Sequence, residues 1–197
     1  GLDDDTRMVV MLASLAHDLG KPATTALDVE GVVRALGHSG AGEEPTRSFL
    51  GRLRFPFVMT EKVVELVKEH LAPFQLFESK AKLGAVRKLA RRLHPATVKE
   101  LCMVATADKL GRGPTMPKDA KECEWLLVRA EEACVVVNKP LPFVTGKDLL
   151  SLGFTPGKRF GELQEWAEKW RDDDEMTKEQ VMARLAYLVK FEDDLAE

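Results

Sequence analysis

Apolar residues recur every three or four positions along almost the whole chain of 197 residues, and no segment alternates convincingly as a strand would. This periodicity predicts an all-α fold. Residues 23–37 are expected to form a loop, and Thr60 is expected to be the N-cap of its helix. The helices are expected at about 6–19, 41–53, 60–71, 80–93, 96–110, 118–134, after Thr145, 159–171 and 177–195.

The first expected helix, residues 6–19, is apolar on nearly every side, which is typical of a helix buried within a core. Gly20 and Pro22 end it. Two polar residues, His17 and Asp18, close this helix. An ionised carboxylate among buried apolar residues is costly unless it is paired or bound to a metal. The pair therefore indicates a polar site at the end of the helix.

Three other polar residues are placed in a similar way. His70 continues an inward stripe of its helix, and Asp108 lies on the inward face of a later one. His38 lies in Gly37-His38-Ser39-Gly40, where the backbone can approach another segment closely. Taken singly, each is explained better by a hydrogen-bonded core residue. Together, three imidazoles and two carboxylates directed at one core predict a divalent-cation site.

The expected ligands also limit the metal and the chemistry. Mixed imidazole and carboxylate ligands suit manganese, iron, nickel, cobalt or zinc, and magnesium stays open as well. A bound metal makes water a better nucleophile and polarises a phosphoryl oxygen, so metal-assisted hydrolysis is the expected reaction class. His94, before Pro95 at a helix end, is expected to be a structural cap outside this site.

The chain is expected to divide into residues 1–137 and a smaller helical segment, 138–197. The linker is expected at residues 138–144, where Pro140 and Pro142 prevent a helix. Beyond it, Thr145 with Asp148 three residues later forms a capping-box pattern.

Charge and cysteine usage describe an ordinary globular protein. The net charge is −3, yet residues 79–112 carry nine basic and two acidic side chains. Without other evidence, solvated helix faces explain such a run better than phosphate binding does. The three cysteines have no CxxC spacing, which suggests reduced thiols. No apolar run is long enough to span a membrane and no signal peptide is evident, so a cytoplasmic location without membrane contact is expected.

Several short segments resemble a known family. Residues 15–22, Leu-Ala-His-Asp-Leu-Gly-Lys-Pro, resemble the signature of HD-domain metal-dependent phosphohydrolases. Residues 36–42, 67–71 and 107–113 are more specific and resemble the HD-bearing half of bacterial tRNA nucleotidyltransferases, the CCA-adding enzymes and poly(A) polymerases. The segment 145–150, Thr-Gly-Lys-Asp-Leu-Leu, resembles their C-terminal helical region. The resemblance implies an HD-domain helical bundle followed by a tRNA-binding-like segment.

The resemblance implies that His17, Asp18 and Asp108 bind the metal. The HD pattern has a further histidine upstream of the His-Asp pair, and this chain has none before His17. The nucleotidyltransferase half, with its glycine-rich motif and paired aspartates, is absent as well. We therefore expect this chain to be the C-terminal part of a longer protein whose gene supplies both upstream of Gly1.

Two further groups are expected to contact phosphate. The resemblance implies that His38 and His70 bind a second ion or contact phosphate as catalytic residues, with Lys21 close to the substrate. Lysines and arginines of the basic run are candidates for RNA phosphates. The residues expected to contact RNA phosphates are Arg87, Arg91, Arg92 and Arg112.

Three hypotheses follow. The first is a divalent-metal phosphohydrolase that acts on phosphomonoesters or 2′,3′-cyclic phosphates of nucleotides or RNA 3′ ends. The second is the non-catalytic tRNA-binding half of a CCA-adding enzyme with a vestigial metal site, and the third is a helical scaffold. The retained set of five polar residues favours the first hypothesis, whereas the missing upstream histidine favours the second.

Overall fold

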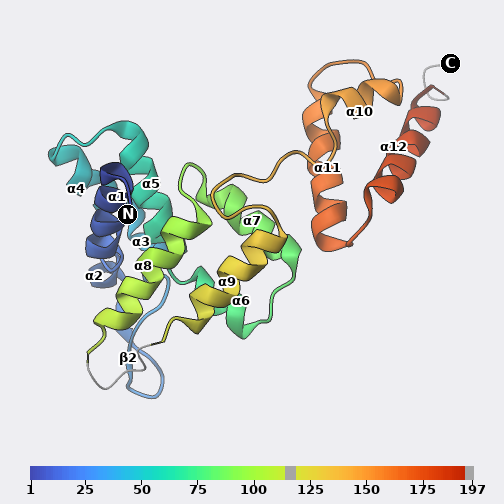
Figure 1. Ribbon diagram of the computed structural model, residues 1–197. Coiled ribbons are helices and arrows are strands. Elements are labelled where there is room, and N and C mark those ends of the chain that lie inside the picture. Colours follow the sequence, from blue (N-terminus) through green and yellow to red (C-terminus); the bar gives the residue numbers. More distant parts are fainter. Residues whose placement is uncertain (114–118, 194–197) are drawn as a thin grey trace. The chain divides into compact units, whose positions relative to one another are not determined.

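The computed structural model describes residues 1–113 and 119–193 and is mostly helical, which confirms the all-α prediction (Figure 1). It divides into two compact units, Gly1–Lys139 and Pro140–Glu197. The division into domains 1–137 and 138–197 stays a prediction. The helices of the first unit are α1 Asp4–Ala16, α2 Lys21–Thr24, α3 His38–Ala41, α4 Glu43–Arg52, α5 Phe57–Glu69, α6 Ala72–Glu78, α7 Leu83–Leu93, α8 Val98–Gly111 and α9 Lys121–Glu132.

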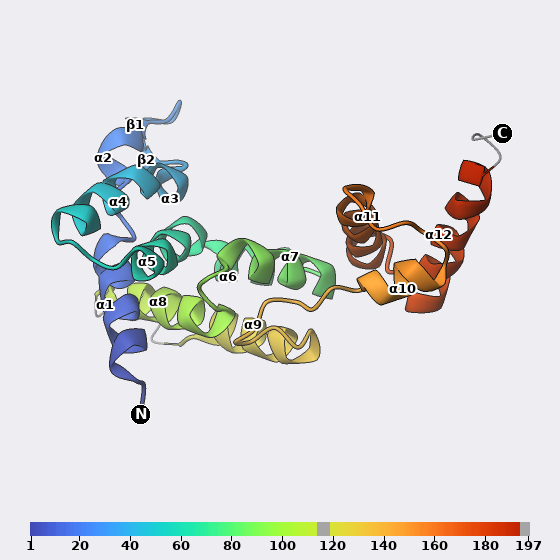
Figure 2. The same cartoon turned by 90° about the horizontal axis from the view of Figure 1, so that it is seen from above.

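The first unit is built around α5 and α8. Helix α1 packs against both, and α4 packs on α5. Helices α6, α7 and α9 gather on the other side of α8 (Figures 1 and 2). Their inward side chains form one continuous apolar core, which includes Val63, Val67, Leu89, Leu101 and Leu126. This core fixes the ends of α1, α5 and α8 relative to one another.

Helix α8 is held firmly at its start. Thr97 accepts a hydrogen bond from the backbone nitrogen of Glu100, and the Glu100 carboxylate accepts one from the backbone nitrogen of Thr97 at 2.8 Å. This reciprocal capping box satisfies backbone donors that have no partner within the helix. Lys62 on α5 pairs with the same buried carboxylate at 2.9 Å. The start of α8 is therefore tied to α5.

Helix α1 is not buried on nearly every side, so that prediction was wrong. Only Val9, Ala13 and Ala16 are buried, and they form one narrow strip. Met11 and Leu15 are 62% and 68% exposed. The reason is that α5 and α8 both pack on that strip, and no other described element covers the opposite face with comparable packing.

Residues 23–37 do not form the expected loop. Strand β1, Thr25–Leu27, follows α2 and pairs antiparallel with β2, Val33–Ala35. Asp28 closes the turn because its carboxylate accepts hydrogen bonds from the backbone nitrogens of Glu30 and Val32, each at 2.9 Å. Three-residue strands are too short to show the alternation by which a strand is recognised.

The predicted role of Thr60 was also wrong. Helix α5 begins at Phe57, directly after Pro56, and the backbone nitrogen of Thr60 donates to the Pro56 carbonyl at 2.9 Å. Thr60 therefore lies inside the helix. The start of the helix expected at 118–134 and the end of the helix expected at 177–195 lie outside the described residues. Helix α9 begins at Lys121.

The second unit has its own core. It contains α10 Gly146–Ser151, α11 Arg159–Asp173 and α12 Lys178–Asp193. The predicted capping box is confirmed: the Asp148 carboxylate accepts from the backbone nitrogen of Thr145 at 2.7 Å and pairs with Lys178 at 3.1 Å. The core residues are Val144, Leu149, Phe154, Leu163, Ala167, Val181 and Leu185. None of the helices described in either unit is long and apolar enough to cross a membrane.

Candidate metal centre

Four segments of the first unit meet at one polar site. His17 and Asp18 follow the end of α1, His38 begins α3, His70 caps the end of α5, and Asp108 lies near the end of α8. We call these five side chains the His-Asp cluster. The structure therefore brings together all five residues that the sequence predicts to share one core.

The three histidines of the cluster are held in the same way. Each ring Nδ1 faces the backbone carbonyl of the residue three positions earlier. Because a carbonyl oxygen only accepts, each Nδ1 carries the hydrogen, and Nε2 of a neutral ring keeps its lone pair. Metal-binding histidines commonly use this backbone contact to fix the ring. The distances are 2.8 Å for His17 to Ser14, 2.7 Å for His38 to Ala35 and 2.7 Å for His70 to Val67.

These lone pairs converge. Nε2 of His38 lies 3.3 Å from Nε2 of His70. The His70 ring, only 1% exposed, lies between its two partners, with centroids 5.2 Å from those of His17 and His38. Two nitrogen lone pairs at this distance repel each other unless a proton or a cation lies between them. The donor set therefore fits a metal ion.

The carboxylates complete the donor set. Nε2 of His17 lies 3.3 Å from Asp18 Oδ2 and 3.5 Å from Asp108 Oδ1. Nε2 of His38 lies 3.5 Å from Asp18 Oδ1. One donor atom each from Asp18, His38 and His70 lies within 4.8 Å of the other two. These three side chains are thus close enough to hold one ion, and His17 with Asp108 borders them.

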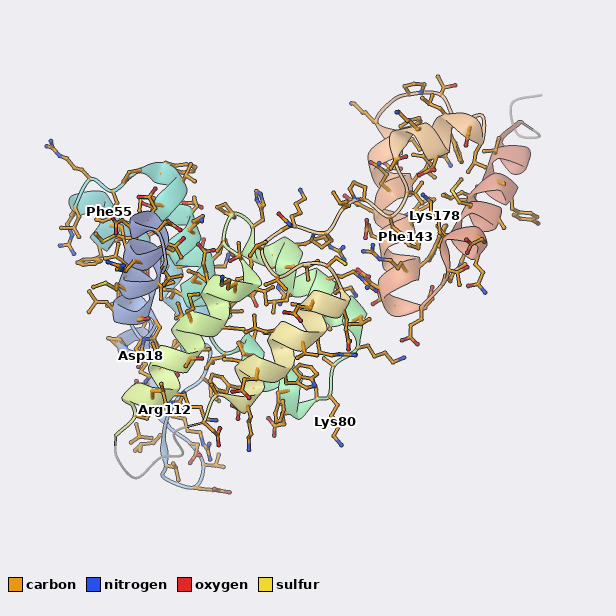
Figure 3. All side chains as sticks on the ribbon, viewed as in Figure 1. Asp18, Phe55, Lys80, Arg112, Phe143 and Lys178 are labelled. Carbon is orange, nitrogen blue, oxygen red and sulfur yellow. The ribbon has the colours of Figure 1, made fainter. Side chains whose placement is uncertain are left out.

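Each carboxylate of the cluster also holds one permanent cation. Lys21 Nζ lies 2.6 Å from Asp18 Oδ2. Arg112 contacts Asp108 through Nη2 at 2.5 Å and Nε at 3.2 Å, and its guanidinium lies over the Phe74 ring at 5.7 Å. Lys21 and Arg112 are both about half-exposed, so they can also reach an anion in solvent. Figure 3 labels Asp18 and Arg112 at the same end of the unit, and Lys80 away from them.

Burial and neighbouring charges set the protonation of the cluster. The hydrogen bond to Asp108 raises the pKa of His17, although burial opposes it. Burial lowers the pKa of His70, and the two neighbouring histidines lower it further. Burial raises the pKa of Asp108, but hydrogen bonds from His17 and Arg112 outweigh it and lower this pKa well below its ordinary value. At neutral pH, His70 is therefore a neutral donor and Asp108 a carboxylate.

Gly20 allows the cluster to form, a role that the sequence did not reveal. A Cβ on Gly20 would lie 2.0 Å from the His38 carbonyl oxygen and 2.5 Å from the Gly42 nitrogen. Only glycine permits backbones to approach so closely. Gly20 therefore brings the segment with His38 against the end of the His-Asp segment. The sequence shows it as a residue that ends a helix and as part of the segment 15–22, and neither indicates this close backbone contact.

Comparison with curated proteins found several relatives. The chain is 31% identical over 164 residues to the A-adding tRNA nucleotidyltransferase of Deinococcus radiodurans. This match covers 81% of this chain and 36% of the relative. It is 34% identical over 186 residues to the CC-adding tRNA nucleotidyltransferase of Thermus thermophilus. This second match covers 89% of this chain and 39% of the relative. The resemblance to tRNA nucleotidyltransferases is confirmed.

A further relative agrees. The chain is 33% identical over 119 residues to the multifunctional CCA protein of Laribacter hongkongensis, which covers 59% of this chain and 28% of the relative. The chain thus spans less than two fifths of the length of these tRNA nucleotidyltransferase relatives. No protein-family model and no solved structure matches it.

The four arginines chosen for RNA do not form one group. Arg112 lies at the cluster, whereas Arg87, Arg91 and Arg92 lie on α7. Arg92 is paired with Glu69, the residue before His70, at 2.7 Å and 2.9 Å. Phe74, which packs beneath Arg112, gave no signal in the sequence. His94 is the C-cap residue of α7 and is not part of the cluster, in agreement with its predicted role.

Proposed function

We propose that the His-Asp cluster is the divalent-metal centre of a phosphohydrolase, within a tRNA nucleotidyltransferase-like protein. Its substrates would be phosphomonoesters or 2′,3′-cyclic phosphates of nucleotides or RNA 3′ ends. One observation carries the proposal: the Nδ1 hydrogens of His38 and His70 are bound by backbone carbonyls, which leaves two Nε2 lone pairs 3.3 Å apart, with the Asp18 carboxylate within reach of both rings. Two facing nitrogen lone pairs in a partly buried site are costly unless a proton or a cation lies between them.

Two overlapping ligand sets are available. The resemblance implies His17, Asp18 and Asp108, and proximity favours Asp18, His38 and His70. Asp18 belongs to both sets, so it is the decisive ligand. Manganese, nickel, cobalt, iron, zinc and magnesium remain candidates, and the imidazoles favour the transition metals. A bound divalent ion would act as a Lewis acid toward a phosphoryl oxygen.

The other residues of the site would bind and orient the phosphate. Lys21 and Arg112 each pair with a carboxylate of the cluster and are half-exposed. Their positive charges would neutralise the charge that develops on the phosphoryl oxygens in the transition state. Neutral His70 cannot donate through Nε2 and would act as a ligand or proton acceptor. Lys21, about half-exposed at the rim of the cluster, would be the first to meet the substrate, and the more buried His38 would contact it deeper in the site.

Hydrolysis assays test this proposal directly. The substrates are 2′,3′-cyclic AMP and an aryl phosphate, with manganese, nickel, cobalt or magnesium added in turn. Turnover should need the metal, Asp18→Ala should abolish it, and His94→Ala should leave it unchanged. Activity that survives in Asp18→Ala would contradict the proposal. So would the absence of turnover both in this chain and in a longer polypeptide that supplies an upstream histidine.

A second candidate is a tRNA-holding region with a vestigial metal site. The relatives favour it, because the two more extensive matches are both tRNA nucleotidyltransferases. The basic helix α7 would then contact phosphates of the tRNA backbone. We expect such a protein in the cytoplasm. Binding of tRNA without hydrolysis of either substrate, under all four metals, would favour this candidate over the first.

A further inference from the structure

Two cysteines of the first unit lie in contact, on neighbouring helices. Cys102 on α8 and Cys123 on α9 are only 3% and 4% exposed. The Cys102 thiol donates to the Cys123 carbonyl oxygen at 3.7 Å. The third cysteine, Cys134, is exposed and follows the end of α9.

The two thiols line a cavity between α8 and α9. Its volume is about 470 Å³, and its walls are mostly apolar, with Met103, Leu110 and Leu127 among them. A small uncharged oxidant such as a hydroperoxide is far smaller than this cavity. The cysteines are therefore buried from bulk solvent but border a space that such a molecule can enter.

The contact makes the two thiols unequal. The neighbouring Cys102 thiol lowers the pKa of Cys123 to about 7, although burial opposes the shift, and Thr106 lowers this pKa further. The same contact raises the pKa of Cys102. Because the thiolate is the reactive form, Cys123 is the expected nucleophile and Cys102 the partner that follows.

We infer that Cys102 and Cys123 form a reversible disulfide between α8 and α9 when the protein meets a hydroperoxide. The Cys123 thiolate attacks one peroxide oxygen, the O–O bond breaks, and a sulfenic acid forms with release of an alcohol or water. The Cys102 sulfur then attacks the sulfenic sulfur and the S–S bond forms. The S–O bond breaks, and the hydroxyl takes up the Cys102 thiol proton and leaves as water. The two thiols lose two electrons, and the peroxide gains them.

This modification would act on the helix that carries Asp108. Lys109 on α8 already pairs with Glu122 on α9 at 2.7 Å. Lys109 is the residue after Asp108, and Glu122 is the residue before Cys123. A disulfide would add a covalent tie along the same helix pair. The inference does not depend on the proposed hydrolysis, because its readout is covalent.

Peptide mapping of the full chain tests the inference. The folded protein is treated with hydrogen peroxide, free thiols are alkylated, and trypsin then separates the three cysteines into peptides 100–109, 122–129 and 130–147. The expected product joins 100–109 to 122–129, is two hydrogens lighter than the two peptides, and disappears after reduction. Oxidation confined to Cys134, or links that include peptide 130–147 as often as the other two, would overturn the inference.

Two variants give matched controls. Cys134→Ser should form the link as completely as the unchanged protein. Cys102→Ser should form none and should leave a sulfenic acid on Cys123 that dimedone traps. If Cys123 stays unmodified in Cys102→Ser while circular dichroism shows a folded protein, the proposed order of attack is wrong. Link formation in the unchanged protein remains the primary measurement, since it does not depend on how a variant folds.

Discussion

Nε2 of His38 lies 3.3 Å from Nε2 of His70, although each ring has already given its Nδ1 hydrogen to a backbone carbonyl. A proton shared between the rings and a metal ion bound to both are the two ways to make this contact favourable. The burial of His70 lowers its pKa and works against the proton. A cation bound to both rings therefore explains this contact better than a shared proton does. The contact joins α3 to the end of α5.

The first prediction concerns this pair of imidazoles. His38→Ala should weaken manganese binding by at least about 10-fold, because it removes a donor from the group that can share one ion. Isothermal titration with manganese measures the dissociation constant. His94→Ala is the matched control, because His94 lies outside the cluster and caps α7. Equal affinities for His38→Ala and the unchanged protein would remove His38 from the ligand set.

The second prediction concerns Gly20. Gly20→Ala should lower the free energy of unfolding by about 1–3 kcal/mol, because the new methyl group would overlap the backbone of residues 38 and 42. It should also weaken metal binding, since His38 belongs to the displaced segment. Gly40→Ala is the control. Gly40 lies in α3, the short helix that begins at His38, and a Cβ on Gly40 meets nothing within 4 Å. Urea unfolding and the manganese titration should both be normal for Gly40→Ala.

Much of the cluster could be predicted from the sequence because helical periodicity fixes which face a residue occupies. His70 and Asp108 lie in line with apolar stripes, so their inward direction follows from their spacing alone. The contact between His38 and His70 could not be predicted. It depends on the close approach of α2 to α3 at Gly20, which is a tertiary contact between backbones.

The wrong prediction for α1 and the missed contacts of Arg112 also have physical causes. The apolar pattern of α1 shows that its side chains tolerate burial, but whether they are buried depends on which elements pack on them. Met11 and Leu15 stay exposed because α5 and α8 both pack on the opposite strip. The salt bridge of Arg112 with Asp108 follows helical spacing, four residues apart, and could have been inferred. The packing of Phe74 beneath Arg112 could not.

The third prediction concerns acid and the second unit. The pKa of Asp148 is lowered from its ordinary value of 3.8 to about 2, because Thr145 donates two hydrogen bonds and Lys178 pairs with it. A carboxylate with a lowered pKa stabilises the folded state above its ordinary value, and this contribution is lost as the pH falls toward the folded value. The stabilisation by Asp148 should therefore disappear between about pH 4 and about pH 2.

Tryptophan fluorescence can measure this loss. In a Trp125→Phe background, the remaining tryptophans are Trp166 and Trp170, so fluorescence reports on the second unit alone. At neutral pH, Asp148→Asn should unfold at a lower urea concentration than its parent. The difference should shrink as the pH falls through this range. A difference that stays constant with pH would show that the carboxylate charge contributes nothing to the stability of α10.

The last prediction concerns tRNA. If α7 contacts RNA phosphates, then Arg87→Glu combined with Arg91→Glu should weaken binding to a tRNA acceptor stem. The slope of log affinity against log salt should fall by about two, roughly one for each lost contact. The control is Arg52→Glu combined with Arg54→Glu, which changes the net charge equally at the end of α4. A reduced slope in the α7 variant alone would place the RNA on α7, because long-range charge effects are the same in both variants. Equal slopes in both variants would show that α7 makes no direct phosphate contact, and the tRNA-holding function would then have to rest on other residues.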